Sequence, residues 1–139
     1  MLDQVQKRLQ ARFQAYADLA ELLDEDLLNL RVEVPKHKSL AEHLWCVVGA
    51  RESYARSLED GDWAGFSCSM QSFSADDFRT KLRESSTAVE TALQGIQDWD
   101  PVRSDLLATL AEHEVMHEGQ IIRHMYALER ELPASWVWA

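Results

Sequence analysis

The stretch LLATLAEHEVMHEGQIIRHMYAL, residues 106 to 128, carries the clearest structural signal in this sequence. Its apolar side chains recur every three to four residues, which is the period of an amphipathic α-helix. His113 and His117 lie on that apolar stripe, so their rings project from one face of the helix and are about 6 Å apart along its axis. We therefore expect a buried helix that presents two imidazoles to the protein interior.

The same period extends over most of the chain and predicts four long helices and no strand. The first stripe runs from Leu2 to Leu30, and we expect it to form one continuous helix. The second helix should begin at a capping box, in which the side chains of Ser39 and Glu42 each accept a hydrogen bond from the other's backbone amide. These signals place the second helix directly after the break at residues 31 to 38.

Local signals also mark the start of the two remaining helices. Ser74 is the expected cap of the third helix, where Phe73 and Phe78 can form a hydrophobic staple. The fourth helix should begin at the cap Asp100 and continue until Pro133, which cannot extend it. The linker between these two helices is short, which favours antiparallel neighbours. Residues 60 to 73 are numerous enough to run the length of a helix, so we expect a four-helix bundle with a long crossover between the second and third helices.

Length and composition narrow the class of protein. The chain has 139 residues, 46% of them hydrophobic, so we expect residues 1–139 to form a single domain. A net charge of −10 disfavours nucleic acid as a partner, and no apolar run is long enough to cross a membrane. The N-terminal MLDQVQKRLQ does not resemble a signal peptide, and Cys46 and Cys68 form no disulfide framework. We therefore expect a cytoplasmic protein with reduced thiols, in which Cys46 is a small buried hydrophobe.

A third histidine points inward from the second helix. His43 lies between apolar residues of that helix, so its ring can meet those of His113 and His117 across the helix interface. Three neutral imidazoles can hold a divalent transition metal and leave coordination positions open for water or substrate. The alternative is three hydrogen-bonded core histidines, but burying three unpaired imidazoles would be costly. The set predicts a metal site, and the imidazole donors alone do not distinguish zinc, nickel, copper and iron.

Four polar residues near these ligands could support the site. Glu42 and Gln120 can orient a histidine through its second ring nitrogen, although the helix cap already explains Glu42. Glu114 can act on a bound water, but we expect it to be an exposed helical glutamate. His124 lies too far along the helix to reach the same ion, so we expect it to be a core or hydrogen-bonding residue. His37 stands between two lysines of the linker and is expected to be exposed to solvent.

The segment HEVMH also matches the HExxH pattern of zinc proteases. In the metzincin extension of that pattern, glycine and histidine would stand where this sequence has Gln120 and Arg123. The helical period continues beyond these residues, and there is no strand on which a peptide substrate could be laid. A zinc hydrolase is therefore a minor alternative.

The chain resembles the DinB-like (DinB/YfiT) family of four-helix bundles over nearly its whole length. The resemblance rests on SLAEHLWCVVGARESY around His43 and on the spacing from His113 to Gln120, which is similar to the family's HxxxHRGQ. It implies that His43, His113 and His117 are the metal ligands, with nickel or zinc as the metal, and that the protein is a homodimer. Glu118 departs from the pattern, because the family usually has arginine at that position.

Two functions of different class follow from this resemblance. The first is an enzyme, a metal- and thiol-dependent transferase or isomerase that acts on a small molecule with a low-molecular-weight thiol. The second is a non-catalytic metal-binding homodimer that serves in a stress response. The sequence names neither a substrate nor a catalytic residue, and it leaves open the roles of Cys46, Glu118 and the Trp-rich C-terminal tail.

Overall fold

The computed structural model describes all 139 residues and contains five helices and no strand. The helices are α1 (Leu2–Ala20), α2 (Glu25–Asn29), α3 (Leu40–Asp60), α4 (Ala75–Gly95) and α5 (Pro101–Ala127). The prediction of an all-α fold is confirmed. None of these helices combines the length and the apolarity that a membrane span requires.

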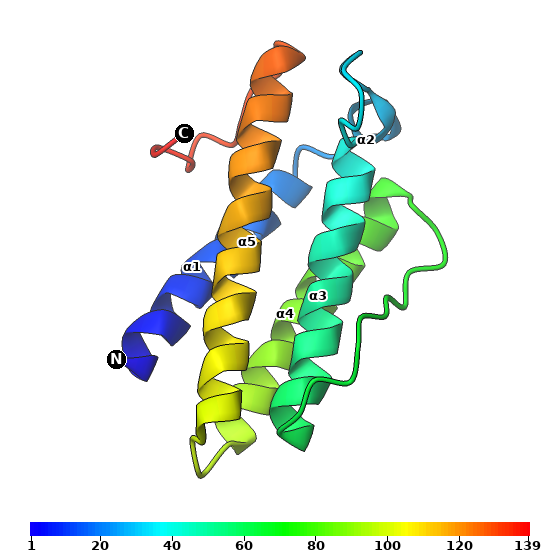
Figure 1. Ribbon diagram of the computed structural model, residues 1–139. Coiled ribbons are helices and arrows are strands. Elements are labelled where there is room, and N and C mark those ends of the chain that lie inside the picture. The colour runs from blue at the N-terminus through cyan, green and yellow to red at the C-terminus, as the bar shows by residue number, and fades with distance from the viewer.

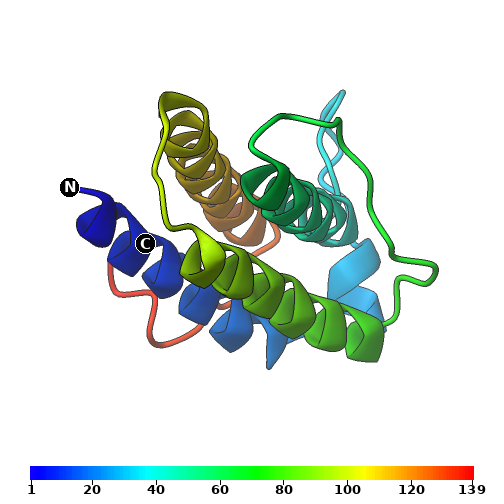
Figure 2. The same ribbon diagram turned by 90° about the horizontal axis from the view of Figure 1, so that it is seen from below.

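The four long helices lie side by side in two layers (Figures 1 and 2). In Figure 2, α3 and α5 form one layer, and α1 and α4 form the other. Both α3 and α1 contact α4 and α5, so the two layers pack against each other. The helices that carry the inward histidines, α3 and α5, are therefore direct neighbours.

The predicted helix caps are present. The Ser39 hydroxyl accepts a hydrogen bond from the Glu42 amide at 3.2 Å, and the Glu42 carboxylate accepts one from the Ser39 amide at 2.7 Å. The Asp100 side chain likewise caps α5 by accepting from a backbone amide. At the start of α4, Phe73 and Phe78 stack with ring centroids 6.0 Å apart. The Ser39 and Asp100 caps favour these helix starts because each satisfies a backbone amide that has no partner inside its helix. The Phe73–Phe78 contact instead packs together the residues on either side of the α4 cap.

The first helix is shorter than predicted. It ends at Ala20, and α2 is a separate helix of five residues capped by Asp24, whose carboxylate accepts from the Leu27 amide at 2.8 Å. Arg79 of α4 donates hydrogen bonds to the carbonyls of Ala20 and Leu23, at 3.0 and 2.6 Å. Arg79 thus binds the chain at the end of α1 and in the turn that follows it. The expectation of one continuous helix was wrong.

The connection between α3 and α4 runs back alongside α3 (Figure 1), so these two helices point in the same direction. The Ser67 amide donates to the Ser53 hydroxyl at 2.9 Å, and the Phe66 ring packs on Trp45 at 5.2 Å between centroids. Glycine at position 49 lets the Phe66 ring lie close to the backbone of α3, because a Cβ at that position would collide with the ring. The connection is therefore packed onto its helix.

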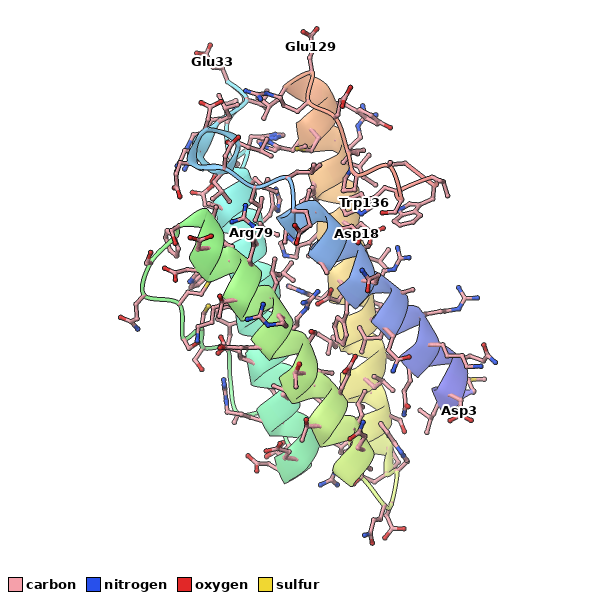
Figure 3. The ribbon with its side chains drawn as sticks, turned by 180° about the vertical axis from the view of Figure 1, so that it is seen from behind. Asp3, Asp18, Glu33, Arg79, Glu129 and Trp136 are labelled. Carbon is pink, nitrogen blue, oxygen red and sulfur yellow. The ribbon has the colours of Figure 1, made fainter.

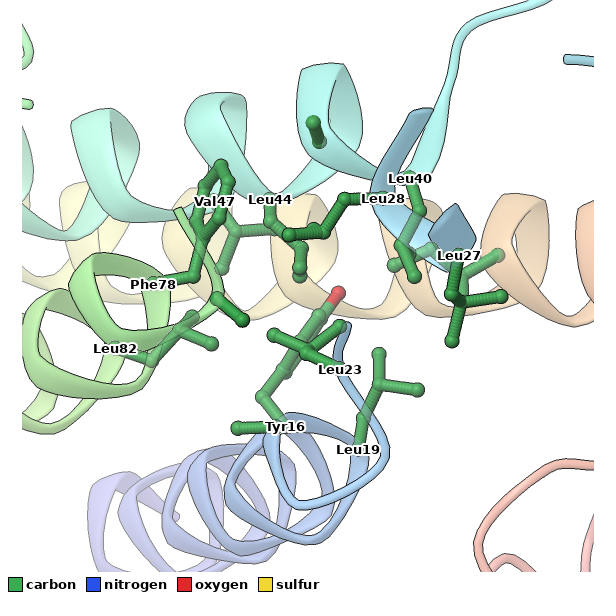
Figure 4. Packing of buried hydrophobic residues seen from close by; sticks show 14 of the residues in the cluster. Tyr16, Leu19, Leu23, Leu27, Leu28, Leu40, Leu44, Val47, Phe78 and Leu82 are labelled. Carbon is green, nitrogen blue, oxygen red and sulfur yellow. The ribbon is translucent and has the colours of Figure 1, made fainter. Parts of the chain in front are cut away.

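The core consists of two clusters of buried apolar residues. The larger one includes Tyr16, Leu44 and Phe78 from three different long helices (Figure 4). The smaller one lies nearer the start of α1 and includes Leu9 and Leu107. Their contacts hold α3 and α5 at fixed positions relative to α1 and α4.

The C-terminal tail after α5 packs back onto α1 (Figure 3). The Trp136 indole is 3% exposed and donates its N–H to the carbonyl of Ala15 at 3.0 Å. The Ser135 hydroxyl bonds the Asp18 carboxylate at 2.6 Å. The apolar tail thus covers a surface of α1 and contributes a residue to the larger core cluster.

Candidate metal centre

All five histidines of the chain lie in one contiguous cluster between α5, the start of α3 and the loop before α3. The His113 and His117 ring centroids are 4.5 Å apart, and those of His117 and His43 are 5.3 Å apart. The His43 ring lies 6.4 Å from that of His124, which stacks on His37 at 5.2 Å. The structure therefore brings together the three predicted ligands and adds two further imidazoles.

The closest approach in the cluster joins the two facing helices. Nδ1 of His43 lies 3.0 Å from Nδ1 of His117, with both rings buried. As a hydrogen bond, this contact requires one ring to carry its proton on Nδ1 and the other to leave its Nδ1 free. Two nitrogens bound to one tetrahedral zinc lie at a similar separation, about 3.3 Å, given zinc–nitrogen bonds of about 2.0–2.1 Å.

His113 contributes a nitrogen that has no partner within the protein. Its Nδ1 is buried and neither accepts nor donates a hydrogen bond. A buried polar atom without a partner costs free energy, so such an atom beside two other imidazoles favours the binding of a ligand or cation there. This orphaned nitrogen is the observation that best fits a metal.

The environment keeps these imidazoles neutral. Burial, together with the nearby Lys38 charge, lowers the pKa of His43 to about 4. Burial also lowers the pKa of His117 to about 3, with His113 adding to the effect, and lowers the pKa of His113 itself. Neutral rings at pH 7 have a free lone pair each, which metal ligation requires.

The observed rotamers do not yet form a coordination sphere. No three or more His, Cys, Asp or Glu side chains are arranged so that they could hold a metal ion. The donor types, their burial and the unpartnered nitrogen fit a divalent metal, and ligation would require the rings to rotate about their side-chain bonds. The site of His43, His113 and His117 thus remains a prediction.

Glu114 is buried, so the expectation of an exposed helical glutamate was wrong. Its side chain is 0% exposed, and its two carboxylate oxygens accept from Nε and Nη2 of Arg51 at 2.7 and 2.8 Å. Arg51 also donates to the Leu82 carbonyl and lies over the rings of Phe13 and Tyr16. Both oxygens of Glu114 are engaged, which argues against a role in activating water at an HExxH-type site.

A sequence signal for this ion pair was present but was overlooked. Arg51 is four residues after Val47 and seven before Leu58, in register with the buried stripe of α3. A charged residue at an interior position needs a partner of opposite charge. Only the fold shows that the partner is Glu114.

Glu42 and Gln120 were expected to orient the histidines, and His124 and His37 to lie outside the metal site. None of the hydrogen bonds of Glu42 goes to a histidine. Its carboxylate caps α3 and pairs with Arg31, which lowers the pKa of Glu42 to about 2. Gln120 is exposed on α5 near the cluster.

His124 is buried, as expected of a core residue, and its Nδ1 lies 3.1 Å from Nε2 of His37. His37 is only half-buried and contacts another histidine, so the expectation of a solvated linker residue was wrong.

Glu118 is bound by residues from two other parts of the chain. Its Oε1 accepts hydrogen bonds from Arg12 of α1 and from the indole N–H of Trp138, both at 2.6 Å. The side chain is 4% exposed, and burial raises its pKa. The glutamate at this position therefore anchors the C-terminal tail and α1 to α5.

No protein-family model matches the sequence, and comparison with curated proteins also finds no match. The chemistry of the histidine cluster therefore rests on its own geometry.

Proposed function

We propose that this protein binds a divalent transition metal through His43, His113 and His117. The observation that carries the proposal is the unpartnered, buried Nδ1 of His113 beside a pair of imidazole nitrogens 3.0 Å apart. The ligands come from α3 and α5, two helices that pack directly on each other, and joint ligation of one ion requires their rings to rotate about the side-chain bonds. Imidazole donors suit zinc, nickel, copper and iron, and the resemblance to the DinB-like family favours zinc or nickel among these metals.

We also propose that the chain is a DinB/YfiT-like four-helix bundle. The connection that returns along α3, and the common direction of α3 and α4 that results, support a crossover between the second and third long helices (Figure 1). One histidine on α3 and two on α5, in the order that the resemblance implies, support it as well. Glu118 stands where the family usually has arginine, and in this chain its carboxylate instead accepts hydrogen bonds from Arg12 and Trp138.

The chemistry proposed for this site is transfer or isomerisation of a small molecule with a low-molecular-weight thiol. A bound divalent ion would act as a Lewis acid that favours the thiolate or hydroxide form of a ligand. The chain itself supplies three neutral donors, which leave the positive charge of the ion uncompensated and favour an anionic ligand. Arg51 and Glu114 hold α3 against α5 close to His113 and so limit the separation of the donors.

Metal content measured by elemental analysis tests the site directly, provided that the protein is purified without a histidine tag. Wild type should carry one metal per chain, whereas His113→Ala and His117→Ala should lose it. His37→Ala is the matched control, because this residue lies at the edge of the cluster and should be dispensable for binding. Equal metal content in all variants would contradict the ligand assignment.

A non-catalytic role is the alternative, in which the ion only ties α3 to α5. The two roles are separated by incubating the metal-loaded protein with common low-molecular-weight thiols and a panel of electrophiles. Thiol-dependent turnover that is absent in His117→Ala would support the enzyme. Stoichiometric metal without any turnover across the panel would favour the structural role.

We propose further that a second copy of this chain covers an apolar groove between α1 and α5. The groove has a volume of about 860 Å³. Arg8 lies on the α1 side of the groove and Glu112 on the α5 side. In a dimer with two-fold symmetry, Arg8 of each copy can therefore face Glu112 of the other copy. The apolar side chains that line the groove are Val5, Leu9, Ala11, Ala108, Ala111, Val115, Met116 and Trp138.

Sedimentation equilibrium tests this dimer. Val115 is 55% exposed in the groove, so Val115→Asp should dissociate the dimer by placing an unpaired charge in the interface. Val102→Asp is the control, because Val102 is 47% exposed but lies outside the groove. A monomeric wild type would contradict the proposal.

A further inference from the structure

A pocket opens beside the histidine cluster and shares His37 and His43 with it. Its volume is about 490 Å³, and only one of its eight lining residues is hydrophobic. Three lining residues are cationic, Lys36, Lys38 and Arg123, and none is acidic. A polar pocket of one charge sign is thus attached to the candidate metal centre.

The three cations have no counter-ion within the protein. Neither Lys36, Lys38 nor Arg123 takes part in any of the chain's salt bridges, although the chain has 24 acidic residues against 14 basic ones. The only side-chain hydrogen bond of the Lys38 ammonium is a long one, 3.6 Å, to the sulfur of Cys46. Like charges gathered at one place repel each other, and a bound anion would relieve that repulsion.

The backbone at the pocket mouth is also unusual. Lys36 has a φ angle of +66°, in the left-handed region that side chains other than glycine seldom occupy. Residues held in that region are concentrated at ligand sites, where the surrounding structure imposes the conformation. Here the conformation belongs to the short loop that carries Lys36, His37 and Lys38 to the pocket.

The cationic loop lies next to a candidate metal ligand. Lys38 and His43 line the same pocket. An anion bound beside Lys38 would therefore lie close to the histidine cluster.

We infer that this pocket binds the anionic group of a small molecule, a carboxylate or a phosphate, and orients that molecule toward His43. Arginine can bind an oxyanion through two N–H groups and lysine through its point charge, and Gln120 adds a neutral amide donor. Met116 supplies an apolar contact for the carbon part of the ligand. The volume suits a small metabolite, whereas a polyanion would meet the acidic remainder of the surface.

This inference names the substrate class of the site proposed above and rests on that proposed function. The molecule's anionic end binds Lys38 and Arg123, and its reactive end lies beside the histidines. The pocket then determines which molecules reach the metal centre, while the histidines determine whether a metal is present. The two roles can be tested separately.

Isothermal titration calorimetry of the full chain with inorganic phosphate and with succinate, in a chloride background of constant ionic strength, tests the pocket. At least one of the two anions should bind, and the tighter one identifies the group recognised. Lys38→Gln and Arg123→Gln should each weaken that binding about tenfold, which corresponds to the loss of a charged hydrogen bond. Lys81→Gln on α4, a lysine outside the pocket, should leave binding unchanged.

Binding of neither anion, or equal binding by wild type and both pocket variants, would overturn the inference. Metal content of the same variants distinguishes this failure from failure of the metal site. Lys38→Gln and Arg123→Gln should keep the wild-type metal content. If anion binding fails while the metal is retained, only the pocket assignment is wrong; if His113→Ala and His117→Ala keep the metal, the proposed function itself is wrong.

Discussion

Arg51 of α3 and Glu114 of α5 form a two-pronged ion pair inside the protein, with nitrogen–oxygen distances of 2.7 and 2.8 Å. Both side chains are at most 1% exposed. The guanidinium lies 4.5 Å from the Phe13 ring centroid and 5.1 Å from that of Tyr16, between residues of the two core clusters. The pair therefore fixes the two helices that carry His43, His113 and His117 at the middle of the core.

Breaking this pair from one side should be strongly destabilising. Glu114→Ala leaves the Arg51 guanidinium buried without its counter-charge, which costs about 3–5 kcal/mol in free energy of unfolding. Urea unfolding followed by circular dichroism measures the loss. The double variant Arg51→Met with Glu114→Leu is the control, because it removes both charges and should recover much of the stability. If the single variant is as stable as wild type, the buried pair does not hold the helices together.

Metal binding should stabilise the folded state. A ligand that binds only the folded protein adds about 2.7 kcal/mol at a free concentration about one hundred times its Kd. Thermal unfolding of metal-free protein, repeated after addition of zinc or nickel, should show a higher Tm in wild type. His117→Ala should show no such increase, because its ring supplies one of the two facing nitrogens. An equal increase in both proteins would place the binding elsewhere.

The start of α2 offers a test of the break after α1. Asp24→Ala removes the carboxylate that accepts from the Leu27 amide, and loss of an N-cap typically costs about 1 kcal/mol. The change should lower the free energy of unfolding by that amount. Glu33→Ala is a matched loss of one carboxylate, at an exposed residue that forms none of the salt bridges, and should have little effect. Equal effects of the two variants would argue against the cap.

The sequence predicted features that depend on residues close together in the chain. Ser39 with Glu42 and Phe73 with Phe78 lie within five residues of each other, so their caps and staple could be identified without the fold. The break near Asp24 was missed because Leu23, Leu27 and Leu28 keep the apolar period through the turn, and all three are buried. Their burial explains why the period continues although the helix does not.

Part of the candidate site could be predicted because it depends only on the local apolar period. His43, His113 and His117 stand on apolar stripes, and that position alone predicted inward rings. His37 and Glu114 could not be placed in this way, because their partners His124 and Arg51 are 87 and 63 positions away in the chain. Only tertiary packing determines such contacts.

The C-terminal tail should contribute to stability through one residue. Trp136 is 3% exposed and bonds the Ala15 carbonyl, so Trp136→Ala removes a buried aromatic ring and should cost about 3–5 kcal/mol. Val137→Ala is the control, because Val137 is 87% exposed. Urea unfolding should show a large loss for the first variant and almost none for the second. Similar stability of both variants would mean that the tail does not pack on α1.

Two helical glycines allow a test of the packing between α3 and the connection that follows it. A Cβ at Gly49 would lie 2.9 Å from Cβ of Cys68 and would also collide with the Phe66 ring, so Gly49→Ala must displace the connection. We expect this overpacking to cost about 1–3 kcal/mol despite the better helix propensity of alanine. Gly119 lies inside α5, and a methyl group added there would meet no atom within 4 Å, so Gly119→Ala should instead stabilise the protein by up to about 1 kcal/mol. Urea unfolding should therefore show opposite signs for the same substitution, and a stabilising Gly49→Ala would mean that the connection does not pack against α3.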